Sequence, residues 1–337
     1  MRKVLVTGSA GFIGFHLSAH LLDEGFSVIG FDGMTDYYDV ALKQRRHGML
    51  LQNEGFRAVE DRLENADRLM ALVAEEKPDV IVHLAAQAGV RYSLEDPRSY
   101  IDSNVVGTFN VMEAAREHKV SHLLMASTSS VYGGNEKMPF AETDQTETPL
   151  TIYAATKAAN EAMGHSYAHL WDLPTTMFRF FTVYGPWGRP DLALFKFVQL
   201  ALEGKPIDVY GHGNMKRDFT HVSDLVRGIR LLIDTAPAHP DKRDTLIEGD
   251  SLSPVAPYRV VNIGNSQPVL LSDFVDEIEK ALGREITRNF MDIQTGEVWT
   301  TWADCDLLQR LTGYTPNTDI VDGVKDFVNW YRSYYQV

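Results

Sequence analysis

The sequence has almost no cysteine and fewer basic than acidic residues. Cys305 is the single cysteine among 337 residues, so an intrachain disulfide, a cysteine-rich zinc cluster and a cysteine-pair redox site are excluded. The 46 acidic residues outnumber the 32 basic ones, which gives a formal net charge of -14. Because sequence-independent binding to nucleic acid needs a basic surface that neutralises phosphates, this charge balance argues against a nucleic-acid partner.

Long apolar runs are also missing. The chain has no run of about eighteen apolar residues, and MRKVLVTG leads into a strand pattern without the features of a secretory signal. We therefore expect a protein that does not span or cross a membrane and that works in the reducing cytoplasm. Apolar residues still make up 44% of the chain, which is enough for one large domain or two joined domains.

Short apolar runs alternate with helical periods through the first half of the chain. The strand-like runs are KVLVTG, SVIGFD, RAVE, DVIVHLAA, HLLMAS and TTMFRFF, and helical segments such as 12–25, 105–118 and 153–171 separate them. Strands this apolar, joined by crossover helices, indicate an α/β fold with a doubly wound, Rossmann-type parallel sheet covered on both faces.

The second half has shorter elements and indicates a smaller, irregular domain. We predict a Rossmann-type domain over residues 1–185, with later strands from about 220–235 and 258–265, and a smaller, discontinuous domain over 186–337. The segment 235–258 is predicted to be an exposed loop because it contains several prolines and no periodicity. The aromatic tail FVNWYRSYY has helical spacing, so we expect the last helix to pack onto the small domain.

The segment VLVTGSAGFIG places Gly8, Gly11 and Gly14 after a strand and at the start of a helix. Backbone amides at a helix N-terminus can meet a pyrophosphate there because glycine has no Cβ in the way. Asp32 ends the next strand. A carboxylate at that point accepts hydrogen bonds from both ribose hydroxyls of the adenosine and repels a 2′-phosphate. The sequence therefore predicts a site for NAD rather than NADP.

The motif YAATK places Tyr153 and Lys157 four residues apart on one helical face. The ammonium group can then lie near the phenol and favour its ionised form. This spacing is common, and by itself it indicates only an exposed pair. Here it follows a dinucleotide loop and the segment ASTSSVYG, which ends a strand with the hydroxyl residues Ser127, Thr128, Ser129 and Ser130. That order of motifs favours a catalytic phenol.

Together these motifs resemble the extended short-chain dehydrogenase/reductase family, in particular its nucleotide-sugar epimerases and dehydratases. The resemblance covers essentially the whole chain and includes HLAAQAGVRYS, NVVGTFNVMEAA, RFFTVYGPWGRPD and RDFTHVSDL. It implies bound NAD and a UDP-sugar substrate. It also implies that Tyr153 takes a proton from a sugar hydroxyl, that Lys157 holds the nicotinamide ribose and that Thr128 contacts the same sugar oxygen.

The resemblance also assigns binding residues. Those expected to contact NAD are Gly8, Gly11, Phe12, Ile13, Gly14, Asp32, Leu63, Leu84, Ala85, Ala86, Asn104, Ser127, Tyr153, Lys157, Phe180 and Val183. Those expected to contact the UDP-sugar are Arg91, Ser129, Ser130, Thr182, Arg189, Asp208, Tyr210 and Arg217. Related enzymes often place an Asp before an aliphatic residue at the adenine. This chain has Arg62 before Leu63, with Asp61 one place early, so its adenine contact departs from the family pattern.

Ser129 and Ser130 stand where dehydrating relatives carry an Asp-Glu pair and decarboxylating relatives carry a Glu. Without such an acid, elimination and enolisation lose their proton shuttle, which leaves epimerisation at C4 through a ketone. The run RFFTVYGPWGRPD most resembles the enzymes that interconvert UDP-glucuronate and UDP-galacturonate, and Ser129, Ser130 and Thr182 are expected to hold the sugar carboxylate. A 4-epimerase for UDP-glucose or N-acetylated sugars and a catalytically silent NAD-binding regulator stay open as alternatives.

Other polar and apolar patterns indicate structural roles. Lys43, Arg45 and Arg46 are predicted to form a solvated helix face, and His83 is predicted to be a satisfied core histidine. The 11 histidines lack paired acidic neighbours, so no metal site is predicted. The helices near 104–118 and 154–171 carry apolar residues on more than one face. In the resembled family such helices form a dimer contact, which predicts a homodimer.

Overall fold

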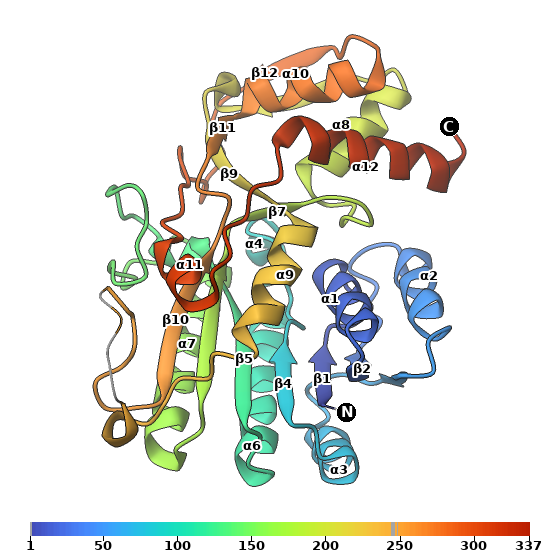
Figure 1. Cartoon of the computed structure of the whole chain (residues 1–337). Helices are drawn as coiled ribbons and strands as arrows, with labels where there is room; N and C mark the ends of the chain where they lie inside the picture. The colour runs from blue at the N-terminus through green and yellow to red at the C-terminus, as the bar shows by residue number, and fades with distance from the viewer. Residues whose placement is uncertain (1, 244–246, 248) are drawn as a thin grey trace.

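The computed structural model describes residues 2–243, 247 and 249–337, and its centre is a seven-stranded sheet (Figure 1). All neighbouring strands in this sheet are parallel. Every strand-like run of the first half forms one of its strands. In sheet order these are β10 (Tyr258–Ile263), β6 (Thr175–Phe180), β5 (His122–Thr128), β4 (Val80–His83), β1 (Lys3–Thr7), β2 (Ser27–Asp32) and β3 (Phe56–Glu60).

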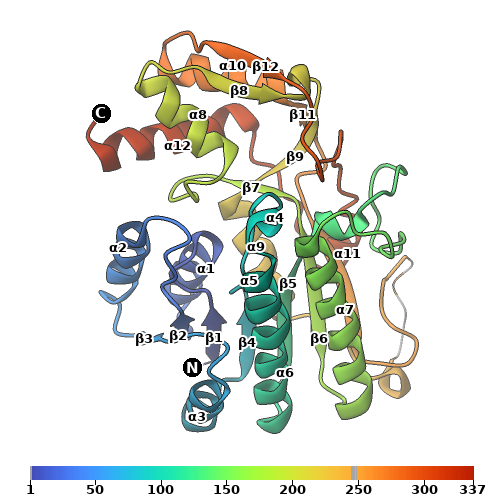
Figure 2. The ribbon, with the colours of Figure 1, turned by 180° about the vertical axis from the view of Figure 1, so that it is seen from behind.

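Helices cover both faces of the large sheet, which explains why its strands are apolar on both sides. Figure 1 shows one face, covered by α1 (Phe12–Asp23), α9 (Val222–Leu232) and α11 (Asp306–Thr312), with α2 (Val40–Leu50) beside α1. Figure 2 shows the other face, covered by α3 (Ala66–Glu76), α6 (Thr108–Glu117) and α7 (Ile152–Trp171). Between β4 and α6 lie α4 (Tyr92–Glu95), α5 (Pro97–Tyr100) and a π-helical segment, Ile101–Gly107.

The winding direction of the sheet reverses at β1, which lies between β2 and β4. The carboxyl ends of neighbouring strands diverge at such a reversal and leave the crevice in which doubly wound sheets bind ligands. The motifs that end β1, β2, β4 and β5 are therefore brought to one edge of the sheet.

A smaller unit lies above this edge (Figure 1). Its strands are β7 (Thr182–Tyr184), β9 (Lys216–His221) and β11 (Pro268–Leu270) in one sheet and β8 (Ile207–Tyr210) with β12 (Arg288–Met291) in another. Its helices are α8 (Ala193–Leu202), α10 (Leu271–Leu282) and α12 (Ile320–Tyr335). Phe327 and Tyr331 of α12 are buried in the apolar core of this unit. The prediction that the aromatic tail packs the last helix here is confirmed.

Two later segments differ in their agreement with the sequence pattern. The strand predicted within about 220–235 is wrong, because most of that segment is helix α9. Its apolar residues repeat at helical spacing and cover the sheet. Residues Tyr258–Ile263, in contrast, form β10 at the sheet edge. The loop predicted over 235–258 contains a short 3-10 turn, Pro240–Lys242, and its residues 244–246 and 248 lie outside the described part of the chain.

The buried polar groups of the large unit bear on two further predictions. His83 Nδ1 lies 2.7 Å from the Thr7 hydroxyl and its Nε2 lies 2.9 Å from the Thr108 hydroxyl, so the prediction of a satisfied core histidine is confirmed. The prediction of a solvated face for Lys43 and Arg46 is wrong, because both side chains are buried and donate to oxygen atoms of neighbouring loops.

The described residues include neither a membrane-spanning helix nor a metal-binding cluster. Within the ranges that the structure describes, no helix is both long and apolar enough to cross a bilayer. In the same ranges, no three His, Cys, Asp or Glu side chains gather in a way that could hold a metal ion.

Candidate active site

A cavity of about 910 Å³ lies between the carboxyl ends of the large sheet and the smaller unit. Its volume is at the upper end of the range for ligand sites. Its wall brings together nearly all the predicted site residues, namely Gly8, Gly11, Phe12, Ile13, Gly14, Asp32, Leu63, Leu84, Ala85, Ala86, Arg91, Ser127, Thr128, Ser129, Ser130, Tyr153, Lys157, Phe180, Thr182, Val183, Arg189, Asp208, Tyr210 and Arg217. Asn104 is the exception.

The glycine loop, the chain from the end of β1 into α1, is too tightly packed for a side chain at any of its three glycines. A Cβ on Gly8 would lie 2.8 Å from the backbone nitrogen of Ala85, and a Cβ on Gly11 or Gly14 would lie 2.9 or 2.0 Å from the carbonyl oxygen of Gly8. Gly8 also has a φ of +75°, which glycine adopts freely. Gly11 caps α1, whose first backbone N–H groups have no partner within the helix. The loop can therefore accept a pyrophosphate.

The carboxylate of Asp32 is fixed at the end of β2. Its Oδ2 accepts a hydrogen bond from the backbone N–H of Ala10 at 2.9 Å, and its Oδ1 accepts one from Met34 at 2.9 Å. Each carboxylate oxygen keeps a further lone pair that can accept from a ribose hydroxyl. The Asp32 carboxylate, the glycine loop and the cavity together fit the adenosine diphosphate half of NAD.

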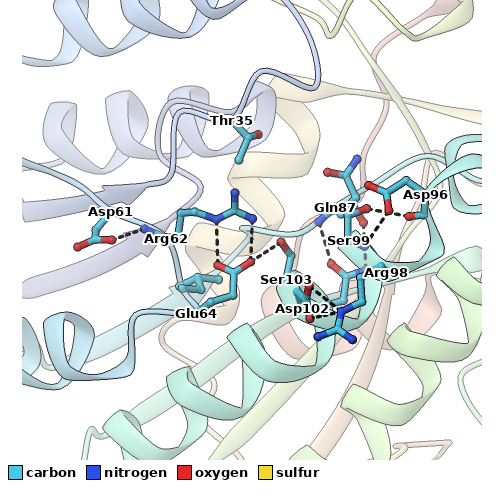
Figure 3. Close-up of polar contacts among 12 residues, drawn as sticks. Thr35, Asp61, Arg62, Glu64, Gln87, Asp96, Arg98, Ser99, Asp102 and Ser103 are labelled. Carbon is cyan, nitrogen blue, oxygen red and sulfur yellow. Dashed lines mark hydrogen bonds and ion pairs between the residues drawn. The ribbon is translucent and has the colours of Figure 1, made fainter.

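Figure 3 shows Asp61, Arg62 and Glu64, the segment in which the sequence departs from the family pattern expected at the adenine. Arg62 and Leu63 line the cavity, whereas Asp61 points away and accepts from the Arg62 backbone at 2.7 Å. The Arg62 guanidinium donates to Glu64 at 3.0 Å, and the Ser103 hydroxyl donates to the same carboxylate at 3.1 Å. Although burial opposes it, the hydrogen bonds from Arg62 hold the pKa of Glu64 below its ordinary value. A hydrogen-bonded ion pair beside a buried leucine thus takes the place of the Asp-aliphatic pair.

Asn104 lies behind the cavity wall, where its side-chain amide is fully buried. Its Oδ1 accepts from the Gln87 backbone at 2.8 Å, and its Nδ2 donates to the Gln87 carbonyl at 3.0 Å and to the Thr156 hydroxyl at 3.1 Å. Gln87 itself lines the cavity. Asn104 therefore supports the wall and does not contact the cavity, because the π-helical segment directs its side chain at the end of β4.

Tyr153 lies in the first turn of α7, which starts here because the Thr151 hydroxyl accepts a hydrogen bond from the Ala154 N–H at 3.2 Å. Burial raises the pKa of the Tyr153 phenol, while a hydrogen bond with Thr128 and the charge of Arg189 lower it. The sequence pattern predicts that Lys157 lowers the pKa of this phenol. In the structure the groups that lower it are Thr128 and Arg189, and burial outweighs both, so the pKa of Tyr153 stays above its ordinary value.

Lys157 lies one turn further along α7 and is almost completely buried. Burial lowers the pKa of its ammonium group to about 8, and the charge of Glu161 opposes this change. Glu161 accepts one hydrogen bond from the Ser127 hydroxyl. It accepts two more from the Arg179 guanidinium, at 3.0 and 2.7 Å. The acid nearest the hydroxyl-rich strand end is therefore paired inside the protein. Sequence reasoning missed Glu161, although its spacing of four residues after Lys157 was a usable signal.

The hydroxyl groups at the end of β5 face the cavity because the strand ends in a tight turn. The Thr128 hydroxyl accepts from the Ser130 backbone N–H at 3.2 Å and starts a 3-10 turn over Ser129–Tyr132. Ser129, Ser130 and, from the start of β7, Thr182 all line the cavity. The part of the wall that these residues form offers small neutral hydrogen-bond donors.

Two of the predicted substrate arginines meet one carboxylate. Arg217 donates to Glu297 at 2.9 Å and Arg91 donates to it at 3.3 Å. The Arg91 guanidinium also lies over the ring of Tyr210, 4.7 Å from its centroid. Glu297 lines the cavity and was missed, because a lone acid in a loop carries no sequence signal.

Arg189 is held by residues that sequence reasoning also missed. Its guanidinium forms two hydrogen bonds with Asp191, at 3.0 and 2.7 Å, and the Tyr37 hydroxyl donates to the same carboxylate at 3.3 Å. A bidentate pair of this kind fixes the plane of the guanidinium. Arg189 is therefore oriented before any anion enters the cavity.

Comparison with known proteins places this site in a family. The model of the NAD dependent epimerase/dehydratase family matches residues 4–247. The probable UDP-glucuronate 4-epimerase of Rhizobium meliloti (strain 1021) is 53% identical over 334 residues, 99% of this chain and 98% of that protein.

Solved structures agree with this placement. The UDP-glucuronic acid 4-epimerase of Bacillus cereus, in complex with UDP-glucuronic acid and NAD, is 32% identical with a TM-score of 0.87 and covers 99% of this chain and 100% of its own. MoeE5 in complex with UDP-glucose and NAD is 31% identical with a TM-score of 0.83 and covers 99% of each chain. The chain belongs to the NAD dependent epimerase/dehydratase family.

Proposed function

We propose that this protein is an NAD-dependent 4-epimerase that interconverts UDP-glucuronate and UDP-galacturonate. The observation that carries the proposal is the arrangement of one cavity wall, where the phenol of Tyr153 meets Thr128, Ser129 and Ser130 while Glu161 is paired behind the wall. The Rhizobium relative and the Bacillus structure, both named for this reaction, support it.

The residues present fit NAD. The glycine loop would hold its pyrophosphate, Asp32 its adenosine ribose and Lys157 its nicotinamide ribose. When bound, NAD supplies a reversible acceptor for the hydride of the sugar C4. Tyr153 and Lys157 are one turn apart on α7 and line the same cavity as the glycine loop.

Tyr153 would act as base and then as acid at the sugar O4. The phenolate would take the O4 proton as the C4–H bond breaks and C4 becomes a ketone, and Thr128 would hold the same oxygen. Once the ketone has turned its other face, Tyr153 would return the proton to O4 as the C4–H bond forms again. The reaction therefore has no net redox change.

The carboxylate of a uronic acid creates a second task for the site. A 4-keto uronic acid is a β-keto acid, which loses CO₂ when the carboxylate stands perpendicular to the carbonyl plane. The hydroxyls of Ser129, Ser130 and Thr182 would hold the carboxylate away from that orientation. With neutral donors at this position, no side chain on this part of the wall shuttles a proton for elimination.

The other half of the substrate would bind to the smaller unit. Arg189, Arg217 and Arg91 offer cationic groups to the diphosphate, and the backbone of β8 around Asp208 and Tyr210 faces the cavity for the uracil. On this view residues 1–185 with β10 carry NAD, and most of residues 186–337 carry the UDP-sugar.

The test is to supply the NAD-loaded protein with UDP-glucuronate and, in parallel, UDP-glucose and to assign the C4 configuration of the products by NMR. Conversion of UDP-glucuronate supports the proposal. Conversion of the neutral sugar alone would replace it with the second candidate, a UDP-glucose 4-epimerase. The complex of MoeE5 with UDP-glucose favours keeping that candidate.

We further propose that the protein is a homodimer in the cytoplasm and serves polysaccharide biosynthesis. Helices α6 and α7 lie side by side on the outer surface (Figure 2), and apolar side chains of this region are exposed to solvent, including Ile101, Val106, Phe109 and Ile152. A second copy that packs the same two helices against them would bury this surface. Light scattering after gel filtration tests the dimer, and a monomer at micromolar concentration would contradict it.

A further inference from the structure

The guanidinium of Arg46 joins two loops that belong to different parts of the site. Arg46 is fully buried in α2. Its Nη1 donates to the carbonyl oxygen of Ala10 in the glycine loop at 3.0 Å and to the Tyr38 hydroxyl at 2.8 Å. Its Nη2 donates to the carbonyl oxygens of Trp187 at 2.6 Å and Gly188 at 3.3 Å.

Trp187 and Gly188 belong to the connection between β7 and α8, which also carries Arg189 and lies over the end of α1 (Figures 1 and 2). Trp187 has a φ of +59°, an unfavourable conformation for a residue with a side chain, so this loop needs outside contacts to hold its shape. His16 of α1 provides another such contact, with Nε2 2.8 Å from the Pro186 carbonyl oxygen.

Arg46 does not line the cavity. Arg46 can therefore act on a ligand through the groups that it binds, which are the two loops and Tyr38, a residue of the cavity wall. One of these loops carries the amides that face the pyrophosphate, and the other carries the guanidinium of Arg189. A buried cation whose donors meet carbonyl oxygens of both loops resists their separation, because a broken bond leaves a buried polar group unpaired.

We infer that Arg46 is a positioning residue that fixes the Arg189 loop against the glycine loop, so that a dinucleotide and a uridine diphosphate group strengthen each other's binding. This inference rests on the proposed function, since it takes UDP as the ligand of Arg189. Each ligand orders one of the two joined loops, and coupling between sites is reciprocal.

The test measures UDP binding to NAD-loaded protein by calorimetry. We expect R46M to weaken UDP binding by about 3- to 30-fold, the range of residues that couple sites without touching the ligand. R46K, which keeps the charge with fewer donors, should fall between R46M and the wild type. The matched control is R45M at the neighbouring exposed arginine, which should bind UDP like the wild type.

A double-mutant cycle shows whether Arg46 acts through Arg189. In an R189M background the further R46M change should have little effect on UDP affinity, because the group that it positions is gone. As a second readout, UDP should increase the fraction of NAD retained through gel filtration in the wild type, and this increase should be smaller in R46M.

Three outcomes would overturn the inference. The first is that folded R46M binds UDP as tightly as the wild type does. The second is that R46M weakens UDP binding as much in the R189M background as in the wild type. The third is that UDP increases NAD retention equally in R46M and in the wild type. If R46M does not fold, R46K decides, and wild-type UDP affinity there contradicts the inference. Failure of the wild type to bind UDP would instead remove the proposed function, and the inference with it.

Discussion

The Ser127 hydroxyl donates a hydrogen bond to the Glu161 carboxylate, which also accepts two from Arg179. This relationship ties the hydroxyl-rich end of β5 to the helix that carries Tyr153 and Lys157. It also keeps the negative charge of Glu161 one helical turn from the buried Lys157 ammonium. The buried ion pair therefore supports the geometry of the site and the protonation of one of its residues.

The first prediction concerns E161Q. This change leaves the buried Arg179 without a charged partner, so the free energy of unfolding should fall by about 3–5 kcal/mol. It should also lower the pKa of Lys157 further, because Glu161 opposes the effect of burial. Urea unfolding measures the first effect. The control is E277Q, which removes an i,i+3 pair with the exposed Lys280 and should change stability far less. Equal losses in both variants would contradict the prediction.

The second prediction is that Y153F abolishes epimerisation and leaves ligand binding intact. Removal of the phenol oxygen removes the general base, which contributes about 10²- to 10⁴-fold to rate. The measurement is kcat from product NMR, with UDP affinity determined alongside. Y167F is a matched control on the same helix, because the Tyr167 hydroxyl donates to Glu113, outside the cavity wall. Comparable kcat losses in the two variants would show that helix disruption, not lost chemistry, explains Y153F.

The sequence was sufficient wherever the signal was local. Gly8 directly follows β1 and Asp32 is the last residue of β2, so strand periodicity alone places them at the same edge of the sheet. The same holds for the hydroxyl residues that end β5. The family resemblance then added the residues of the smaller unit, such as Thr182 and Arg217, which line the cavity.

The sequence was insufficient where two distant segments meet. Arg46 is buried because the loop at Trp187, which comes 141 residues later in the chain, folds over α2. The helical period of α2 cannot predict this contact. Glu297 pairs with Arg91 across 206 residues. Asn104 lies in a π-helical segment and binds the Gln87 backbone behind the cavity wall, a position that its place in the sequence pattern does not reveal. In each case the missing information is the path of a loop.

The third prediction concerns T182A. If Thr182 holds the sugar carboxylate, its loss removes a hydrogen bond to a charged group and should raise the KM for UDP-glucuronate by about 10- to 100-fold. A freer carboxylate should also lose CO₂ from the keto intermediate, which mass spectrometry would detect as a UDP-pentose. UDP has no carboxylate, so its affinity is the internal control. Unchanged KM and product ratio would remove this role for Thr182.

The fourth prediction is that D32N reduces the preference for NAD. The amide would lose the acceptor that ribose hydroxyls need and would no longer repel a 2′-phosphate, so NAD affinity should fall by about tenfold while NADP affinity falls less. Fluorescence titration of cofactor-free protein measures both affinities. D36N, at an exposed acid four residues later, should leave both unchanged. A loss of equal size for NAD and NADP would indicate only that the Asp32 bonds to Ala10 and Met34 shape the loop.

The fifth prediction concerns stability in acid. Burial lowers the pKa of His83 to about 3 and those of His16 and His122 to about 4, well below the value of about 6.5 for an unfolded histidine. Between these limits the unfolded chain binds more protons than the folded protein, so stability falls as pH falls. Glu142 acts in the opposite direction, because burial raises its pKa to about 7.

Near pH 5 the three histidines bind more protons in the unfolded chain, and Glu142 binds more in the folded protein. The unfolded chain therefore carries about two extra protons, and the free energy of unfolding should fall by about 3 kcal/mol for each unit that the pH falls. Urea unfolding between pH 7 and 5 measures this slope. H83N should reduce it by about one proton, or about 1.4 kcal/mol per pH unit, whatever its effect on absolute stability. Because the comparison is between slopes, a general loss of stability in H83N cannot imitate the predicted change, and an unaltered slope would show that His83 takes up its proton in the folded protein.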